Sequence, residues 1–410
     1  MRCDGTIHAG GRAPLALPLL ILLLLFLMFL DPAEGAPSLE NNFTGVKEGW
    51  AWPVVVIPPP EGWDSPAGAS IKYAMRLAER AISLERGGIM GKEVTFMFSG
   101  ISSPDELTDR MASWRAMGVS IIVSFAGGAM DADLARMCQA NGPSVIFSGG
   151  EDLAIRNPGT GMPYQFLFAL DLPYFARANA LAEAAMTEYP PVDVAVMTDS
   201  LSTKLAKGAS LNVNFLTARG IRAMEMSVVA YRQDQFNVQV RNAEAGGFRS
   251  FTCWLDAMAT LSIWRTASLR PNGSVVFYAG NQHRILLDAE GLILADKDVL
   301  LIRNDAGRRE ISLKVRDMFN AELQDQVTAA RAYALGRWAI SAYERTPSGE
   351  GRGLAYELAR MSGIPLMDED LAIDPRTHRP VSRKFGLLRI EGRQYRSFGL
   401  VEVFSSEASE

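Results

Sequence analysis

The sequence predicts an α/β protein made of two doubly wound lobes, each with a parallel sheet and helices on both faces. Apolar runs of strand length alternate with amphipathic segments of helix length, and this rhythm restarts after Phe168. Strand–helix–strand passages of this spacing are right-handed crossovers, which make neighbouring strands parallel. One sheet of about eight strands would fit the 410 residues, but two sheets of four or five strands are more natural at this length.

The first half of the chain is expected to hold four strands joined by helices. The strands are predicted at residues 54–57, 94–98, 119–123 and 145–147. Apolar residues recur at helical spacing between residues 71 and 82, and Gly87 ends that helix. Ser103 and Pro104 start the next helix, since proline is favoured in a first helical turn.

The second half repeats the alternation and then changes character. Strands are predicted at residues 192–197, 221–229, 248–255 and 275–278, with helices at 173–188, 204–219, 236–245 and 258–269. Residues 319–343 form one long amphipathic helical pattern, and 354–361 a shorter one. The end reads as a turn at 374–378 followed by a hairpin with strands at 385–390 and 398–404.

The first 35 residues are predicted to be a signal peptide and are excluded from the fold. Arg2 and Arg12 form a short basic start, residues 15–30 are almost entirely apolar, and small residues around Gly35 favour cleavage before Ala36. The sequence therefore predicts a periplasmic protein. The alternative is an uncleaved anchor, because the apolar run is close to the shortest length that spans a bilayer. Cys138 and Cys253 remain after cleavage and are interpreted as buried apolar residues.

Composition and motifs argue against several classes of function. The net charge is −5 and both signs are interspersed, so no basic stripe for nucleic acid is present. The sequence has three histidines and no paired metal-binding spacing, which indicates no metal site. A proline-rich turn follows the first strand instead of a glycine-rich phosphate loop, and no G-x-S-x-G or Walker motif occurs. We therefore expect no cofactor and no enzymatic activity.

Turns that follow parallel strands are the expected ligand sites. In open parallel sheets, ligands bind beyond the carboxyl ends of the strands, where backbone N–H groups and the positive ends of helix dipoles converge. The candidate ligand-binding residues in such turns are Trp63, Ser65, Ala126, Gly127, Gly128, Ala129, Asp171, Tyr174, Asp199, Asp256, Met258 and Asn281.

Each candidate also has a purely structural interpretation. The small residues of the turn at 126–129 would let a ligand carboxylate approach backbone N–H groups, but the same turn could simply pack tightly. Asp256 would hold a ligand ammonium opposite that turn, or cap a helix. Trp63 would stack on a ligand or belong to the core, and Ser65 would bond a ligand or cap a helix. Asp171 lies where the chain would cross between lobes and is equally plausible as a cap.

Five segments carry a resemblance to a known family. They are GGIMGKEV at residues 87–94, SPD at 103–105, MGVSII at 117–122, DPRTH at 374–378 and the hairpin at 388–401. In this order they resemble the type I periplasmic binding proteins, and among them the branched-chain amino-acid (leucine/isoleucine/valine) binding proteins of ABC importers. The resemblance spans residues 52–404. Three departures concern the proposed site. Asp199 follows a strand where the family often has an aromatic residue and a glycine, and residues 168–170 lack an Arg that is common before the crossing. Gly127, Gly128 and Ala129 stand where the family often has Ser or Thr.

The resemblance implies two lobes joined by three crossings that close around a ligand by a hinge motion. The N-terminal lobe would comprise residues 46–168 and about 282–365, and the C-terminal lobe residues 169–281 and about 366–405. In amino-acid binders the turn matching 126–129 receives the ligand carboxylate, and an acid in the turn matching Asp256 takes the ammonium.

The sequence therefore favours a monomeric periplasmic solute-binding protein of an ABC importer. Its partners would be a small polar ligand, such as an amino acid, and an inner-membrane ABC permease. The alternative is a periplasmic sensing module of the same fold that regulates a membrane kinase or an envelope enzyme. An exported enzyme is the third class, and the scarcity of histidine and nucleophile motifs argues against it.

Overall fold

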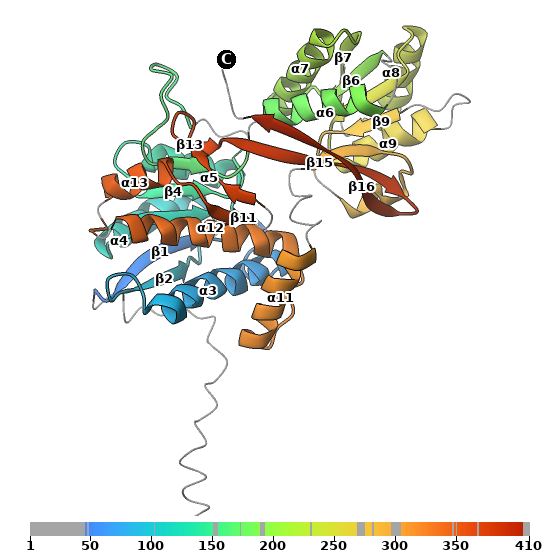
Figure 1. Cartoon of the computed structure of the whole chain (residues 1–410). Helices are drawn as coiled ribbons and strands as arrows, with labels where there is room; N and C mark the ends of the chain where they lie inside the picture. Colours follow the sequence, from blue (N-terminus) through green and yellow to red (C-terminus); the bar gives the residue numbers. More distant parts are fainter. Residues whose placement is uncertain are drawn as a thin grey trace, which may run out of the picture.

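The computed structural model contains two separate sheets of parallel strands, each covered by helices on both faces (Figure 1). The structure describes residue 46 and residues 49–404, apart from residues 102, 151–154, 173, 189–192, 230–231, 269–274, 281–282, 297–304, 347, 350 and 367–368. The predicted signal peptide, residues 1–35, lies outside the described residues. Among those that are described, no helix combines the length and apolar character needed to cross a bilayer.

The first sheet has five strands in the order β2-β1-β3-β4-β5, all parallel. Its strands are β1 (Ala51–Ile57), β2 (Glu93–Phe98), β3 (Ile121–Ser124), β4 (Ser144–Phe147) and β5 (Leu167–Ala169). The helices of this lobe are α3 (Pro66–Arg86), η1 (Pro104–Glu106), α4 (Leu107–Ala116), α5 (Gly128–Cys138), α11 (Asp305–Phe319), α12 (Gln326–Arg345) and α13 (Gly351–Ala359).

Strand residues that point to opposite faces fill two cores in this first lobe. Val54 and Val56 of β1 pack with α3, α12 and α13 on one face, whereas Val55 and Ile57 pack with α4 and α5 on the other. This alternation follows from the period of two along a strand. All four side chains are fully buried, and each contributes about 1.5–3 kcal/mol relative to exposure.

The second sheet has seven strands in the order β16-β15-β10-β9-β8-β6-β7. Its strands are β6 (Val194–Asp199), β7 (Ala223–Val228), β8 (Ser250–Trp254), β9 (Val275–Tyr278), β10 (Ile293–Asp296), β15 (Ser382–Glu391) and β16 (Gln394–Phe404). β6 to β10 are parallel, and the hairpin β15–β16 is antiparallel. Helices α6 (Tyr174–Glu188) and α7 (Thr203–Ala218) cover one face, and α8 (Gln233–Ala245) and α9 (Ala257–Ser268) cover the other.

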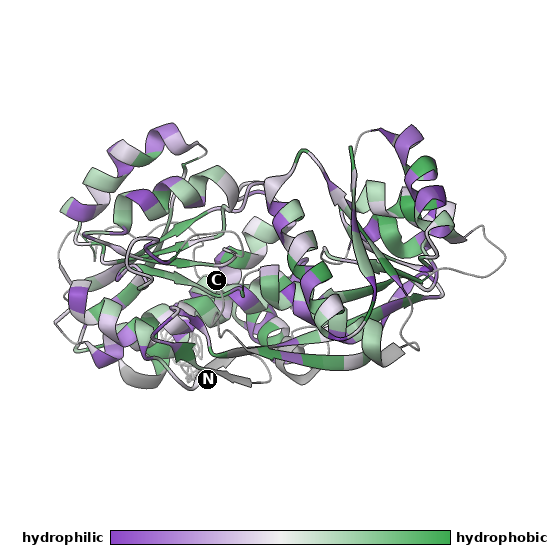
Figure 2. Ribbon diagram, turned by 90° about the horizontal axis from the view of Figure 1, so that it is seen from above, coloured by the Kyte–Doolittle hydropathy of each residue, from purple (hydrophilic) through white to green (hydrophobic). Residues whose placement is uncertain are grey.

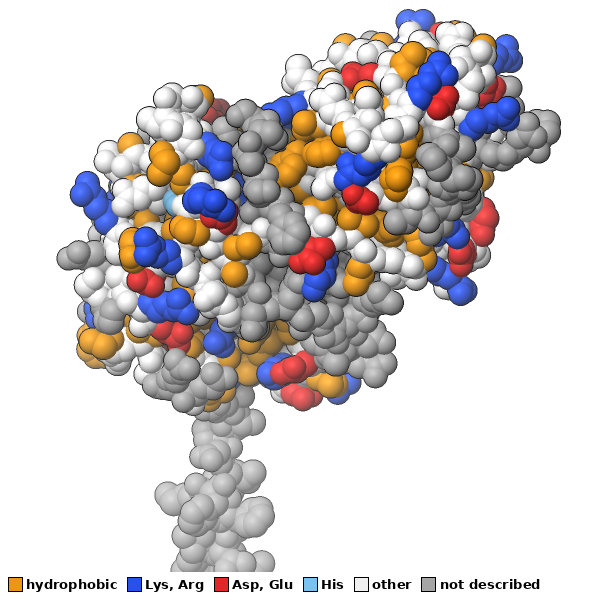
Figure 3. All heavy atoms as spheres, turned by 45° about the horizontal axis from the view of Figure 1, so that its top comes forward, with side chains coloured by type: hydrophobic (Ala, Val, Ile, Leu, Met, Phe, Trp, Pro, Cys, Tyr) orange, Lys and Arg blue, Asp and Glu red, His pale blue; other side chains and the backbone are white. Residues whose placement is uncertain are grey.

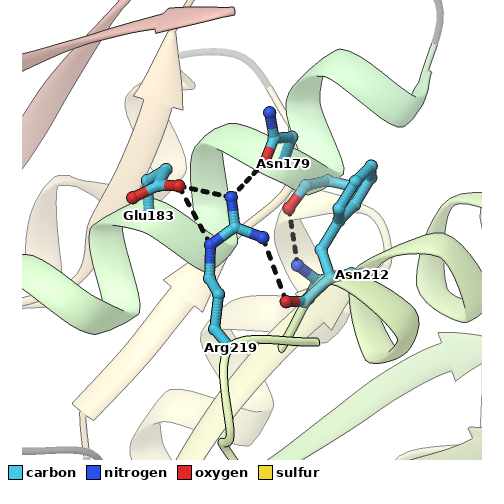
Figure 4. A network of polar contacts seen from close by, with 6 residues as sticks. Asn179, Glu183, Asn212 and Arg219 are labelled. Carbon is cyan, nitrogen blue, oxygen red and sulfur yellow. Dashed lines mark hydrogen bonds and ion pairs between the residues drawn. The ribbon is translucent and has the colours of Figure 1, made fainter. Parts of the chain in front are cut away.

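A polar network fixes α6 against α7 (Figure 4). Arg219 follows the end of α7 and donates from its Nε to Glu183 of α6 at 2.9 Å, and from a terminal nitrogen to Asn179. The fully buried Asn212 donates to the carbonyl of Ala178 at 2.8 Å. Because α6 begins beside the first crossing between lobes, this network holds the start of the second lobe in place.

The chain passes between the lobes three times. It passes from β5 to α6, then from β10 to α11 and α12, which pack on α3, and finally from β14 (Arg379–Pro380), beside β5, to β15. Near the third crossing the buried ring of His378 stacks on Phe168 at 4.5 Å, and its Nδ1 lies 3.0 Å from the carbonyl oxygen of Leu167. In Figure 1, β15 and β16 run from between the lobes across the second one.

Figure 2 shows hydrophobic residues concentrated along the strands and hydrophilic residues on the outer helices. Cys138 and Cys253 are both free and buried, one in each lobe, as the sequence suggested. Burial raises the pKa of the Cys138 thiol to about 12. On the face shown in Figure 3, acidic and basic side chains lie side by side.

Some predicted elements differ from the structure. Of the helical pattern predicted at 319–343, only residues 326–343 lie in one helix, α12: α11 already ends at Phe319, Asn320 takes φ 50°, and the Asp325 carboxylate caps α12. β5 and β10 were not predicted, because three or four apolar residues carry too little periodicity. β10 pairs with β9 in the second sheet, whereas the predicted boundary near residue 282 assigned it to the first lobe. At the other boundary, predicted near 366, β11 (Ile364–Leu366) still contacts α12, and the second sheet resumes only at β15.

Candidate ligand-binding site

Several helices begin directly beyond the carboxyl ends of parallel strands: α3 after β1, α5 after β3, α7 after β6 and α9 after β8. The first N–H groups of a helix cannot bond within it, so a side-chain cap, water or a ligand must accept from them. A helix among these four that lacks a side-chain cap therefore indicates where a ligand anion would bind.

Three of the four have side-chain caps. Ser65 accepts from the N–H of Gly68 at 3.0 Å and donates to the carbonyl of Gly62 at 2.7 Å. At α7, Ser202 accepts from the N–H of Leu205 at 3.3 Å. At α9, Asp256 accepts from the N–H of Ala259 at 2.7 Å. Ser65 and Asp256 are thus helix caps in the structure, which is the structural interpretation that the sequence left open for both.

Helix α5 differs, because Gly127 stands at its N-cap and provides no side-chain hydrogen bond. Gly127 and Gly128 have φ of 69° and 55°, a left-handed conformation that favours glycine. Gly128 and Ala129 are exposed, and within the described part of the chain neither backbone N–H has an acceptor. Helix α8 also lacks a side-chain cap, but it follows the edge strand β7. The turn after β3, the middle strand of the first sheet, therefore has backbone N–H groups that can bind an anion.

A buried carboxylate lies behind this turn. Asp131, in the first part of α5, is 3% exposed and accepts from the hydroxyl of Ser124, the last residue of β3, at 2.5 Å. Burial raises the pKa of Asp131 to about 6, opposed by hydrogen bonds from Ser124 and from the backbone of Gly127. Asp131 therefore stabilises the glycine turn from its buried side. The sequence analysis did not select Asp131, because an Asp in the first part of a helix is common.

Trp63 is half-buried at the same edge of the first lobe. Its Nε1 donates to the carbonyl of Ser99 at 2.5 Å, and its ring meets Phe98 edge-on with centroids 5.2 Å apart. Lys72 lies over the ring at 5.5 Å from its centroid. These contacts fix the indole between the turns that follow β1 and β2.

The second lobe brings Asp256 and Met258 together at the start of α9. Both are exposed, Met258 to 52%. Burial raises the pKa of the Tyr278 phenol to about 12; the charge of Arg177 opposes this rise, and the charge of Asp256 adds to it. Asp199 ends β6 and accepts from the N–H of Leu201 at 3.1 Å, so it stabilises its own turn.

Asp171 occupies the first crossing and is 2% exposed. Its carboxylate accepts from the guanidinium of Arg331 of α12 at 2.8 Å, and its carbonyl accepts from Arg379, beside the third crossing, at 2.6 Å. Arg331 also donates to the carbonyl of Ser148. Asp171 thus joins two crossings to the first lobe. Tyr174, three residues later at the start of α6, packs edge-on against the buried Trp254 with centroids 5.8 Å apart.

The candidate residues therefore divide by position. Trp63, Ser65 and the turn at 126–129 lie at the carboxyl edge of the first sheet, and Asp199, Asp256 and Met258 at that of the second. Asp171 and Tyr174 lie at the crossing. Asn281 lies outside the described residues. Within the described part of the chain, no group of three or more His, Cys, Asp or Glu is placed to hold a metal ion.

Solved structures of periplasmic binding proteins share this architecture. A leucine binding protein from Thermotoga maritima matches with a TM-score of 0.64 and 16% identity, over 85% of this chain and 98% of that one. An ABC-type branched-chain amino acid transporter from Rhodopseudomonas palustris matches at 0.67 and 13%, over 87% and 97%. A solute binding protein of an ABC transporter from R. palustris, in complex with 4-hydroxybenzoate, matches at 0.61 and 15%, over 86% and 97%.

No protein-family model matches the sequence, and no curated protein does. The structural matches nonetheless cover most of both chains, and two separate sheets, one parallel and one mostly parallel, joined by three crossings are present here. The chain therefore has the fold of the type I periplasmic binding proteins, as its motifs suggested. These three relatives are binding or transport proteins rather than enzymes.

Proposed function

We propose that this protein is an exported solute-binding protein of an ABC importer that captures a small carboxylate-bearing molecule between its two lobes. The fold supports this role, since the solved structures that share it are ABC transporter binding proteins. Residues 1–35 supply the proposed export signal, and an inner-membrane permease is the proposed partner. A sensing module of the same fold would use the same ligand site and differ only in its membrane partner.

The uncapped start of α5 is the observation that carries the ligand assignment. The N–H groups of Gly128 and Ala129 point out of a helix whose dipole favours negative charge, and glycine at 127 and 128 leaves room for close approach. A carboxylate is the group that such a site receives best. Trp63 would provide an apolar wall for the body of the ligand.

The second lobe would hold the other end of the ligand. Asp256 uses one oxygen, Oδ1, as a helix cap, and its carboxylate is exposed. A ligand ammonium would bond to its second oxygen, and Met258 would contact the ligand body. An amino acid has both groups, a carboxylate for the first lobe and an ammonium for the second. An aromatic acid, such as the 4-hydroxybenzoate bound by one structural relative, would satisfy only the first.

The ligand can be identified without choosing a panel in advance. Mass spectrometry of small molecules that accompany the protein purified from the periplasm should show one carboxylate-bearing compound. Titration of that compound into stripped protein should give a Kd of about 1 µM, a binding free energy of about −8 kcal/mol. Recovery of the protein from the cytoplasm, or turnover of the compound, would contradict the proposal.

A substitution at the helix start makes the test specific. Ala129→Asp places a carboxylate where the ligand anion would bind, while an acid in the first turn suits the helix dipole and preserves the fold. The affinity should fall at least about a hundredfold. Ala132→Asp, at an exposed position one turn further along α5, is the matched control and should bind nearly as wild type. Equal binding by both variants would reject the assignment.

A further inference from the structure

A hollow lies in the first lobe, at the opposite edge of the sheet from the turn at 126–129. This amino-edge pocket has a volume of about 450 Å³ and is formed by the segments that precede β3, β4 and β5 together with the start of α13. β3 alone has four residues, so about 13 Å of strand separates the pocket from the start of α5. The volume is within the range of small-molecule sites.

The charged groups of the amino-edge pocket are all cationic. Arg115 and Arg352 line it, and none of the described lining residues is acidic. Arg115 donates to the backbone carbonyl of Gly142 at 2.8 Å, which holds its guanidinium at the pocket without neutralising it. Arg352 is exposed and, within the described residues, has neither a hydrogen-bond acceptor nor an acidic partner. Two uncompensated guanidinium groups at one hollow favour an anion.

The remaining lining adds an apolar wall and neutral polar groups. Val119 and Phe166 are 5% and 4% exposed and form the apolar side. Ser120 and the exposed Asn141 provide a hydroxyl and an amide. Gly351 and Arg352 are the first residues of α13, so the positive end of that helix also faces the pocket. Apolar and cationic groups together suit a ligand with both an apolar body and an ionised head.

We propose that the amino-edge pocket is a second binding site, separate from the cleft between the lobes, for a small organic anion. Arg115 and Arg352 would bind the carboxylate or phosphate head, and the wall of Val119 and Phe166 would contact the apolar body. The site belongs to the first lobe alone. Its lining therefore includes no residue of the second lobe and none of the candidate residues for the proposed cleft.

Titrations followed by NMR of the ¹⁵N-labelled protein purified from cells test this proposal. The probes are phenyl phosphate, inorganic phosphate and the neutral benzyl alcohol. Phenyl phosphate should shift the amide signals of Val119, Ser120, Asn141 and Gly142 saturably, with a Kd at or below about 1 mM. Inorganic phosphate should bind these amides more weakly, and benzyl alcohol should bind more weakly still.

Variants connect the shifts to the arginines. Arg352→Gln alters an exposed side chain outside any described hydrogen bond, so the fold should persist, and phenyl phosphate should bind at least about tenfold more weakly at these amides. Arg115→Gln should weaken binding likewise, while Arg360→Gln, an exposed arginine just beyond α13, is the matched control for net charge and should bind as wild type. The proposal is overturned if these amides show no saturable shift, if benzyl alcohol binds as well as phenyl phosphate, or if Arg352→Gln binds as Arg360→Gln does.

Discussion

The two lobes have the same layered architecture but present different groups to a ligand. At the carboxyl edge of the first sheet, α5 begins with two glycines, no side-chain cap and exposed backbone N–H groups. At the carboxyl edge of the second, α7 and α9 are capped by Ser202 and Asp256. Within the described residues, the first lobe therefore leaves backbone N–H donors available at this edge, and the second presents the exposed carboxylate of Asp256. In the proposed binding mode, two similar folds thus bind different chemical groups, an anion and a cation.

The largest effect is expected at the crossing that joins these lobes. Arg331→Met removes the guanidinium that pairs at 2.8 Å with the carboxylate of Asp171, which is 2% exposed. Removal of one partner of a buried ion pair costs about 3–5 kcal/mol, so the free energy of unfolding measured in urea should fall by that amount. Arg136→Met removes an exposed pair with Asp133 and should leave stability close to wild type. Similar losses in both variants would show that Asp171 does not depend on Arg331.

The buried carboxylate of the first lobe should show a pH-dependent effect. The pKa of Asp131 is raised from 3.8 to about 6. The folded state therefore binds a proton more tightly than the unfolded state, and this group destabilises the protein as pH rises from about 4 through 6. Asp131→Asn should raise the free energy of unfolding by up to about 3 kcal/mol at pH 7.5 and by little at pH 4.

Urea unfolding of the wild type and Asp131→Asn at both pH values checks this expectation. The difference between the two proteins isolates Asp131 from other groups that titrate. A gain in stability that is the same at pH 4 and pH 7.5 would mean that the carboxylate of Asp131 carries no burial penalty.

The proposed cation site of the second lobe is tested by a variant that removes the charge of Asp256 but keeps its cap on α9. Asn serves as well as Asp at an N-cap, so Asp256→Asn should leave the free energy of unfolding within about 0.5 kcal/mol of wild type. If the ligand carries an ammonium, its Kd in calorimetry should rise at least about tenfold, and Asp256→Lys should abolish binding. Unchanged affinity in both variants would show that Asp256 does not bind a ligand ammonium. The ligand would then be an acid without an amine.

The smallest effect is expected at Ser65, whose hydroxyl caps α3. Ser65→Ala should cost about 1 kcal/mol in the free energy of unfolding and should leave the ligand Kd within about twofold of wild type. Thermal or urea unfolding measures the free energy of unfolding, and calorimetry measures the ligand Kd. A loss of affinity with unchanged stability would instead make Ser65 a ligand contact.

The sequence predicted the lobes well because their signals are local. Apolar runs such as residues 54–57 and the helix starts at Ser65 and Ser103 are short-range patterns. β10 was missed, since its four residues carry little periodicity and become a strand by pairing with β9 and with β15, of which β15 is distant in sequence. The glycine turn at 126–129 could be found from its composition. The link from Asp171 to Arg331 could not, because it joins residues 160 positions apart.

A crystal structure of the protein with its co-purified ligand tests the central claim most directly. The account predicts a carboxylate oxygen about 2.7–3.2 Å from the backbone nitrogen of Gly128 or Ala129, with the ligand enclosed by turns from both lobes. A ligand bound elsewhere, or one whose charged head contacts neither nitrogen, would contradict it.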